Sequence, residues 1–271
     1  MLTRRVCASV LAATVTALAI GVTPAGASTR ARTVRRDAAD APNGGVLLDG
    51  WGGLHPTGLP GVTPAITGAP YWPGWDIARG ITVRADHSGG FVVDAWGGLH
   101  WFSVGTPRSA PTVFGAAYWP GRNMAEGVAL MPDGSGGFVV DNTGALHWFS
   151  LGHRRPAPKV FAAALPPGWN LARGVALLRD GSGGYVVDSA GDLHWFSVGR
   201  ARPARPANTA LHAPGEDLVQ GIAITAAGQG FSFTRDALVT TFVSTAKDGT
   251  STSSAVQSPY HGPAPIRDGT I

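Results

Sequence analysis

The chain has 271 residues, including 39 glycines and 21 prolines, and only 14% of its residues are charged while 44% are hydrophobic. This composition supplies enough apolar side chains for a buried core and many turns, so it favours a turn-rich β protein and excludes a mainly helical one. The formal net charge of +4 comes from residues 1–43, which leaves the remainder near neutral and excludes nucleic acid as a partner of the main body.

Residues 1–27 have the features of a secretory signal peptide. Arg4 and Arg5 form a basic start, residues 6–22 form an apolar run, and the Ala-Gly-Ala stretch at 25–27 is a small-residue cleavage site. A membrane anchor is the alternative, but a run of about 17 apolar residues is at the lower limit for a bilayer span, and the cleavage site argues against retention. We therefore expect a secreted, extracellular protein without a membrane span after cleavage.

The segment at 28–43 is basic and rich in Ala and Arg, and we expect a disordered, solvated linker. Contact with an anionic cell-wall polymer is an alternative use of its arginines. Cys7 is the only cysteine and lies in the predicted signal peptide, so the mature chain has no disulfide. Its stability then depends on its core and on how its fold closes.

Two patterns recur along the rest of the chain. One begins with Pro-Gly and occurs at 73–80, 120–127, 167–174 and 214–221, in steps of 47 residues. A fixed period of about 40–50 residues is typical of a propeller or a solenoid. The other pattern is an aspartate followed six residues later by a histidine: Asp49 with His55, Asp94 with His100, Asp141 with His147, and Asp188 with His194.

The content of one period favours the propeller. Within residues 158–198 a short extended run is followed by three strand-like runs, GVALL, GYVVD and LHWFSV, which Gly-rich turns connect. Four short antiparallel strands without a helix match one propeller blade. We expect an all-β, five-bladed β-propeller of four-stranded repeats over residues 44–271, in which residues 228–243 form a degenerate copy.

The two ends of this region are predicted to complete each other. An open propeller leaves exposed edge strands, and the copy that starts at Gly44 lacks the piece that precedes the others. Residues 258–271 supply a match to residues 69–82, so we expect the strand at 269–271 to pair beside 46–49 and close the ring of a monomer. The aligned positions are Pro259 with Pro70, Tyr260 with Tyr71, Ile266 with Ile77, and Gly269 with Gly80.

The repeated Asp and His residues are predicted to be structural. Alternate residues of a strand face opposite sides of a sheet, so Leu193 and Trp195 share one face while His194 shares the other with Phe196. A buried histidine needs a hydrogen-bond partner, and the aspartate six residues earlier is the natural candidate. Lining of a surface pocket in each blade is the alternative. The aromatic residues expected in the core between blades are Trp101, Trp148 and Trp195.

Catalysis is not indicated by these repeats. An active site needs unlike groups with pKa values driven apart, and the four Asp–His pairs are nearly identical. Glu216 with Asp217, and Glu126 in a position otherwise taken by Arg or Gln, are the nearest to an asymmetric acid. The DGSGG turn offers one carboxylate, too few for calcium. We expect no catalytic residue, no metal and no cofactor.

Aromatic residues of the inter-strand loops are the candidates for ligand binding. Aromatic rings on loops can stack on the apolar C–H face of a sugar, although covering the blade core is an alternative role for them. The candidates are Tyr71, Trp72 and Trp75 in the first loop, Tyr118 and Trp119 in the second, and Trp169 in the third.

The line GGYVVDxxGxLHWF resembles repeats of secreted proteins from high-GC Gram-positive bacteria. The architecture resembles the tachylectin family of five-bladed sugar-binding lectins, and residues 169–174 (WNLARG) are similar to that family's Asn-Trp-Leu-Ala-Arg stretch. The resemblance implies carbohydrate binding but places no binding residue in this sequence. We expect a secreted, lectin-like, non-catalytic module for a glycan or cell-surface polymer. The alternatives are a propeller-fold glycoside hydrolase or lyase that uses the channel mouth, and a structural or adhesion propeller that binds another protein.

Overall fold

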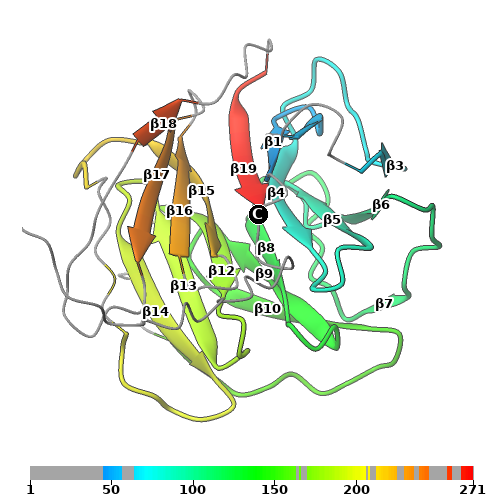
Figure 1. The fold of residues 1–271 in the computed structure, drawn as a ribbon. Coiled ribbons are helices and arrows are strands. Elements are labelled where there is room, and N and C mark those ends of the chain that lie inside the picture. The colour runs from blue at the N-terminus through cyan, green and yellow to red at the C-terminus, as the bar shows by residue number, and fades with distance from the viewer. Residues whose placement is uncertain are drawn as a thin grey trace, which may run out of the picture. The chain divides into compact units, whose positions relative to one another are not determined.

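The computed structural model describes residues 45–56, 64–162, 165, 170–205, 207, 212–224, 229–234, 238–243, 255–257 and 264–270. They belong to one compact unit, residues 39–271. Within the described ranges every regular element is a strand (Figure 1), and no helix there is long and apolar enough to cross a bilayer. The predicted signal peptide, the linker at 28–43 and Trp169 lie outside the described residues.

Three sheets share one antiparallel pattern, in which the first strand lies at one edge and the second at the opposite edge. Their orders are β3-β6-β5-β4, β7-β10-β9-β8 and β11-β14-β13-β12. The strands are β3 (Ile66–Thr67), β4 (Ala78–Val83), β5 (Gly89–Asp94), β6 (Leu99–Val104), β7 (Val113–Phe114), β8 (Ala125–Leu130), β9 (Gly136–Asp141), β10 (Leu146–Leu151), β11 (Val160–Ala162), β12 (Ala172–Leu177), β13 (Gly183–Asp188) and β14 (Leu193–Val198).

The fourth sheet has the order β15-β16-β17-β18, so its edge strand comes last in the chain instead of first. The degenerate copy predicted at 228–243 contributes its two middle strands. The described residues therefore form four four-stranded blades in a propeller arrangement, as the period of 47 residues predicts. The strands of the fourth sheet are β15 (Val219–Ile224), β16 (Gln229–Thr234), β17 (Leu238–Val243) and β18 (Ala255–Gln257).

A fifth, three-stranded sheet joins the two ends of the chain. Its order is β19-β1-β2, with β1 at Val46–Asp49, β2 at Leu54–Pro56 and β19 at Ile266–Thr270. Strand β19 begins three residues earlier than the strand we predicted at 269–271. Its register also places Asp268, and not Gly269, at the position of Gly80, because Asp268 pairs with Leu48 as Gly80 pairs with Val93. The match of identical residues, Ile266 with Ile77 and Gly269 with Gly80, was therefore one residue off in this strand.

The inner strands β4, β8, β12, β15 and β19 lie side by side near the centre of the molecule (Figure 1). Glycine explains how closely they approach. A Cβ atom on Gly80 would lie 2.7 Å from the Cα of Gly127, and one on Gly127 would lie 2.9 Å from the Cα of Gly174. No side chain fits in these gaps. A glycine therefore recurs at this position of each inner strand except β19, where Asp268 replaces it.

The core consists of apolar clusters between neighbouring sheets. Phe91 of β5 packs with Phe149 of β10, and Phe138 of β9 packs with Phe196 of β14, at ring centroid distances of 6.4 Å. In the three-stranded sheet, Leu47 and Ile266 pack with residues of the fourth sheet, including Phe233. The predicted core tryptophans are buried (Trp195) or half-buried against these clusters (Trp101 and Trp148).

Candidate functional site

The predicted Asp–His hydrogen bond is present in all four copies. The distance from His Nε2 to Asp Oδ2 is 2.7 Å for His55 and Asp49 and 2.9 Å for His194 and Asp188. The other carboxylate oxygen accepts two backbone amides of the following turn, as Asp49 Oδ1 does from Trp51 (2.9 Å) and Gly53 (2.8 Å). Each aspartate therefore fastens a hairpin turn to the strand that follows it. The other two pairs are His100 with Asp94 (2.8 Å) and His147 with Asp141 (2.9 Å).

These hydrogen bonds set the protonation of the aspartates. Burial raises the pKa of Asp188, but the hydrogen bonds from His194 and from the backbone amides of Asp192 and Ala190 outweigh it, so the pKa lies below its usual value. The pKa values of Asp49 and Asp141 are lowered in the same way. The ionised carboxylate is thus the form that the turn stabilises, and the histidines remain partly exposed.

Two of the six aromatic candidates pack against these pairs. The ring of Trp72 meets His100 edge-on at 4.9 Å, and Trp119 meets His147 in the same way at 4.9 Å. The Trp119 ring also covers Gly97 of the preceding sheet, where a Cβ would lie 3.1 Å from it. Trp72 and Trp119 are half-buried, and each packs the loop that carries it against a histidine of the same sheet. Their contacts favour a packing role.

Three of the candidates are exposed on the crossover loops, which we define as residues 68–77 between β3 and β4 and residues 115–124 between β7 and β8. The exposed fraction is 58% for Tyr71, 49% for Trp75 and 58% for Tyr118. Trp75 meets Trp96 edge-on at 5.5 Å, which leaves one side of an aromatic pair toward solvent. We call these three residues the aromatic face.

A second group of polar side chains was not among our candidates. Each inner strand has a β-bulge at the same step of the period, and the extra residue in each bulge is polar. The sequence feature that could have identified them is their regular spacing of 47 residues, together with the one acid among basic and neutral side chains. These residues, which we call the inner-bulge cluster, are Arg79, Glu126, Arg173, Gln220 and Arg267.

The arginines of this cluster bind the crossover loop of the next repeat. Arg173 Nε donates to Asp217 Oδ1 at 2.8 Å, and Arg79 Nε donates to Asn123 Oδ1 at 3.1 Å. Arg267 forms a fork with both carboxylate oxygens of Asp76. The three arginine side chains are only 11% to 18% exposed, whereas the carboxylates of Asp76 and Asp217 are 40% and 46% exposed, so water screens these ion pairs from one side.

Arg267 also links two members of the cluster directly. Its Nη1 donates to Gln220 Oε1 at 2.7 Å, and Gln220 Nε2 donates to Asp217 Oδ1 at 3.4 Å. Chains of such contacts run from one inner strand to the next. Apart from Glu126, the cluster is therefore one polar network on the side of the inner strands that faces the crossover loops.

Glu126 is the exception within the cluster. It forms neither a hydrogen bond nor an ion pair within 4.0 Å with any residue that the structure describes. Burial raises its pKa to about 7, against the opposing field of Arg173, Arg79 and Arg267. A carboxyl group that titrates near neutral pH, with no equivalent in the other repeats, is the asymmetric acid that the repeats alone did not identify as part of a site.

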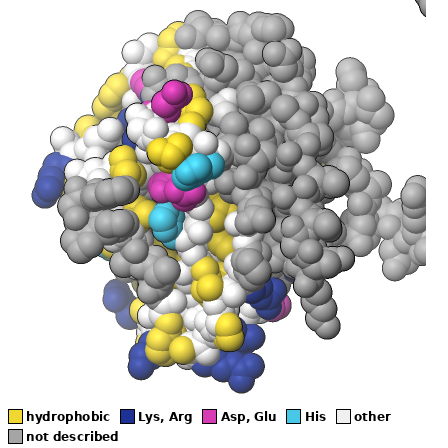
Figure 2. Space-filling model, turned by 90° about the vertical axis from the view of Figure 1, so that its left-hand side faces the viewer, with side chains coloured by type: hydrophobic (Ala, Val, Ile, Leu, Met, Phe, Trp, Pro, Cys, Tyr) yellow, Lys and Arg dark blue, Asp and Glu magenta, His cyan; other side chains and the backbone are white. Residues whose placement is uncertain are grey.

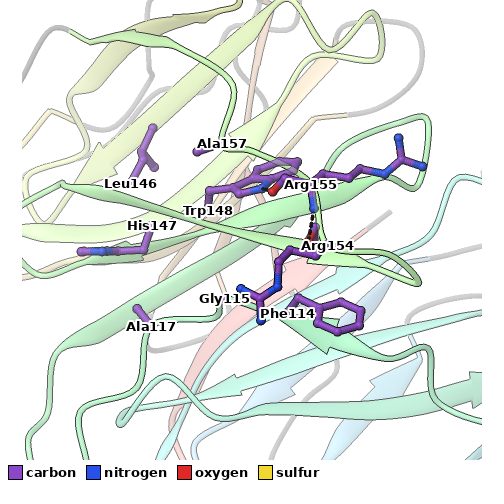
Figure 3. Close-up of a pocket in the computed structure, with 10 residues that line it drawn as sticks. Phe114, Gly115, Ala117, Leu146, His147, Trp148, Arg154, Arg155 and Ala157 are labelled. Atoms are coloured by element: carbon purple, nitrogen blue, oxygen red, sulfur yellow. Dashed lines mark hydrogen bonds between the residues drawn. The ribbon is translucent and has the colours of Figure 1, made fainter.

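A shallow depression of about 370 Å³ lies at the edge of the second blade (Figure 3). It is bordered by Phe114 of β7, Trp148 of β10 and the loop that follows β10. The guanidinium of Arg154 lies 5.6 Å from the Phe114 ring centroid, and Trp148 Nε1 donates to the carbonyl of Arg155 at 3.3 Å. Gly115 and Ala117, from the crossover loop that carries Tyr118, also line the depression.

The surface shows where the histidines and acids gather. On the side drawn in Figure 2, histidine side chains lie next to acidic side chains among apolar ones, while basic side chains gather mostly toward one end of the view. Across the described residues no group of three or more His, Cys, Asp or Glu side chains could hold a metal ion.

No family model and no curated protein matches the chain. Among solved structures, it is similar to a chain of a nidogen/laminin complex, with 16% identity, 80% of each chain covered and a TM-score of 0.49. It is also similar to the WD40 domain of SCAP from fission yeast, with 11% identity, 67% of this chain and 42% of that chain covered, and a TM-score of 0.24. Likenesses this distant carry no information about the ligand, so the assignment of the fold rests on the strands and their pairing.

Proposed function

We propose that the protein is a secreted, non-catalytic binding module for a glycan or a cell-surface polymer. The observation that carries the proposal is the aromatic face, where Tyr71, Trp75 and Tyr118 are each about half exposed on two crossover loops. Exposed aromatic rings held by a rigid scaffold suit stacking on the apolar face of a sugar ring. The predicted export signal is consistent with an extracellular ligand.

The scaffold in this proposal is a closed five-bladed propeller. Three contacts of β19 support it: the strand pairs with β1 and lies against both β15 and β4. The three-stranded sheet would then be the fifth blade, built from both ends of the chain. Such closure removes two exposed sheet edges from a protein without disulfides.

Binding is favoured over catalysis by the state of the acids near Glu126. Hydrolysis of a glycosidic bond generally needs two carboxyl groups with different roles. Asp76 is held by Arg267, and Asp217 is held by Arg173. Both carboxylates are thus engaged in structural ion pairs, whereas the rings of the aromatic face are exposed.

The test is a glycan array probed with the secreted protein, followed by the triple variant Tyr71→Ala, Trp75→Ala, Tyr118→Ala. We expect binding to at least one glycan class, and its loss in the triple variant at an unchanged melting temperature. Phe114→Ala, which removes a ring from the depression at the second blade, is the matched control and should keep binding. Binding that disappears in Phe114→Ala but persists in the triple variant would move the site to that depression.

The same experiment separates the competing functions. Capture of a protein partner, with no glycan bound, would favour the adhesion propeller. Release of reducing sugar from a bound glycan would favour the hydrolase. Export is tested by N-terminal sequencing of the protein from culture medium, which we expect to begin near Ser28.

A further inference from the structure

Glu126 lacks the contact with the next crossover loop that the three arginines of the inner-bulge cluster make. These arginines bind that loop through Asn123, Asp217 and Asp76. Asn170 occupies the equivalent place for Glu126, one period before Asp217, yet forms no hydrogen bond with it. The carboxyl group of Glu126 is therefore left as an unused acceptor beside the network.

Two arginines lie on either side of this carboxyl group in the order of the inner strands. Arg79 belongs to β4 and Arg173 to β12, and β8, which carries Glu126, contacts both strands. The field of both guanidinium groups acts on Glu126, but each uses its Nε and Nη1 elsewhere. The Nη2 groups of Arg79 and Arg173 donate to no described residue, so the strands on either side of Glu126 each carry a donor that is not used.

The charges limit what such a site can hold. An anion would meet the carboxylate of Glu126, and a cation would meet three guanidinium groups. A hydroxyl group both donates and accepts, so two adjacent hydroxyls can donate to the carboxylate while they accept from the arginines. A sugar with vicinal hydroxyl groups fits this arrangement without an unpaired charge.

We propose that Glu126, Arg79 and Arg173 form a subsite that binds vicinal hydroxyl groups of a sugar residue. The crossover loops connect it to the aromatic face: Trp75 is adjacent to Asp76, which Arg267 and Arg79 bind. The subsite rests on the proposed glycan-binding function, and adds to stacking on the aromatic rings the polar contacts that select a sugar.

The experiment is an NMR titration of the mature protein with the methyl pyranosides of glucose, mannose, galactose and N-acetylglucosamine, and separately with inorganic phosphate. We expect at least one glycoside to bind with a Kd on the order of 1 mM, as suits a small ligand that makes few polar contacts. Glu126→Gln and Glu126→Ala should each weaken it about tenfold or more. Glu216→Ala removes an exposed acid of the fourth repeat and is the matched control, with no expected change.

The isosteric Glu126→Gln variant guards against misfolding, because it keeps the shape of the side chain. The subsite is overturned if no glycoside binds, if Glu126→Ala binds as the unchanged protein does, or if phosphate binds in place of the glycosides. Its failure is distinct from failure of the proposed function. Array binding that depends on the aromatic face and ignores Glu126 would overturn the subsite alone.

Discussion

The Oδ2 atom of Asp268 accepts a hydrogen bond of 2.9 Å from the backbone amide of Ile81, across 187 positions in the sequence. Asp268 is 4% exposed and stands where Gly80, Gly127 and Gly174 stand in the other inner strands. A hydrogen bond in a buried place is electrostatically stronger than one exposed to water. The bond ties the C-terminal strand β19 to β4 of the first four-stranded sheet.

Replacing this carboxylate should destabilise the protein. Asp268→Ala leaves the amide of Ile81 without that acceptor, and a buried unsatisfied donor costs about 1–3 kcal/mol. Asp268→Asn keeps an oxygen at the site and should cost less. Urea unfolding measures both changes. Equal stability of Asp268→Ala and the unchanged protein would contradict a role for this bond in holding β19.

Removal of the C-terminal segment should have a larger effect than removal of the linker. Deleting residues 258–271 removes β19 and exposes the edges of β1 and of the strands it contacts. Burial of an aliphatic side chain such as Ile266 (0% exposed) contributes roughly 1.5–3 kcal/mol, a large part of a typical total of about 5–15 kcal/mol. We expect aggregation or much earlier melting, whereas deletion of residues 28–42 should leave the melting temperature unchanged. Equal melting temperatures of the two truncated proteins would contradict the proposed closed five-bladed ring.

The Asp–His pairs should affect stability and leave ligand binding unchanged. Asp188→Ala or His194→Ala should cost about 1–3 kcal/mol, the range for a buried polar group that loses its partner. Since the pKa of Asp188 is lowered in the folded state, its contribution is present above about pH 4 and is lost as pH falls through the folded pKa. Unfolding curves at several pH values measure both effects. A variant with normal stability and no ligand binding would instead make the pair part of the binding site.

Glu126 should make stability depend on pH in the opposite sense. Its pKa is raised from its usual 4.5 to about 7. The stability that its preference for the protonated form contributes is therefore fully present below about pH 4.5 and is lost as pH rises through 7. The charged groups that face it are Arg79, Arg173, Arg267 and Asp217, and the guanidinium groups stay protonated throughout this range. Glu126→Gln should therefore gain stability relative to the unchanged protein between pH 5 and 8, by on the order of 1–3 kcal/mol. A difference that stays constant with pH would contradict the raised pKa.

The inner glycines should tolerate no side chain. In Gly127→Ala the new Cβ would lie 2.9 Å from the Cα of Gly174, which is backbone and cannot turn aside. Overpacking of this kind costs about 1–3 kcal/mol, and thermal unfolding measures it. Ser109→Ala, at an exposed position between β6 and β7, is the control and should change nothing. A Gly127→Ala variant as stable as the control would mean that the inner strands can move apart.

The repeats predicted most of the fold because one short pattern carries several structural requirements. Glycine in the turns, short apolar runs in the strands, and the Asp–His spacing all point to the same four-stranded unit, and these strands are observed in three sheets. The fourth sheet was harder to predict, because its edge strand β18 follows the other three and lacks the expected pattern. The alignment of the C-terminal strand was one residue off, since a match of identical residues does not show which residues pair in the sheet.

For the site, the sequence likewise did not predict which of the aromatic candidates are exposed. From the sequence, Trp72 and Trp75 are equivalent loop tryptophans. In the structure Trp72 packs edge-on against His100, while Trp75 remains half exposed. Whether an aromatic side chain on a crossover loop packs against the core or faces solvent depends on the strands and turns that it meets in the folded protein. No local sequence pattern shows these contacts.

By itself, the sequence determined the period, the strands and the pairing of each aspartate with its histidine, because these depend on residues close together in the chain. Only the tertiary structure decided which distant residues meet. It brings Glu126 between two arginines 47 residues away on either side, and it places Asp268 against Ile81. Such contacts arise from the packing of inner strands around a common centre, where five equivalent positions of the chain converge and a single unlike residue changes the chemistry of the whole group.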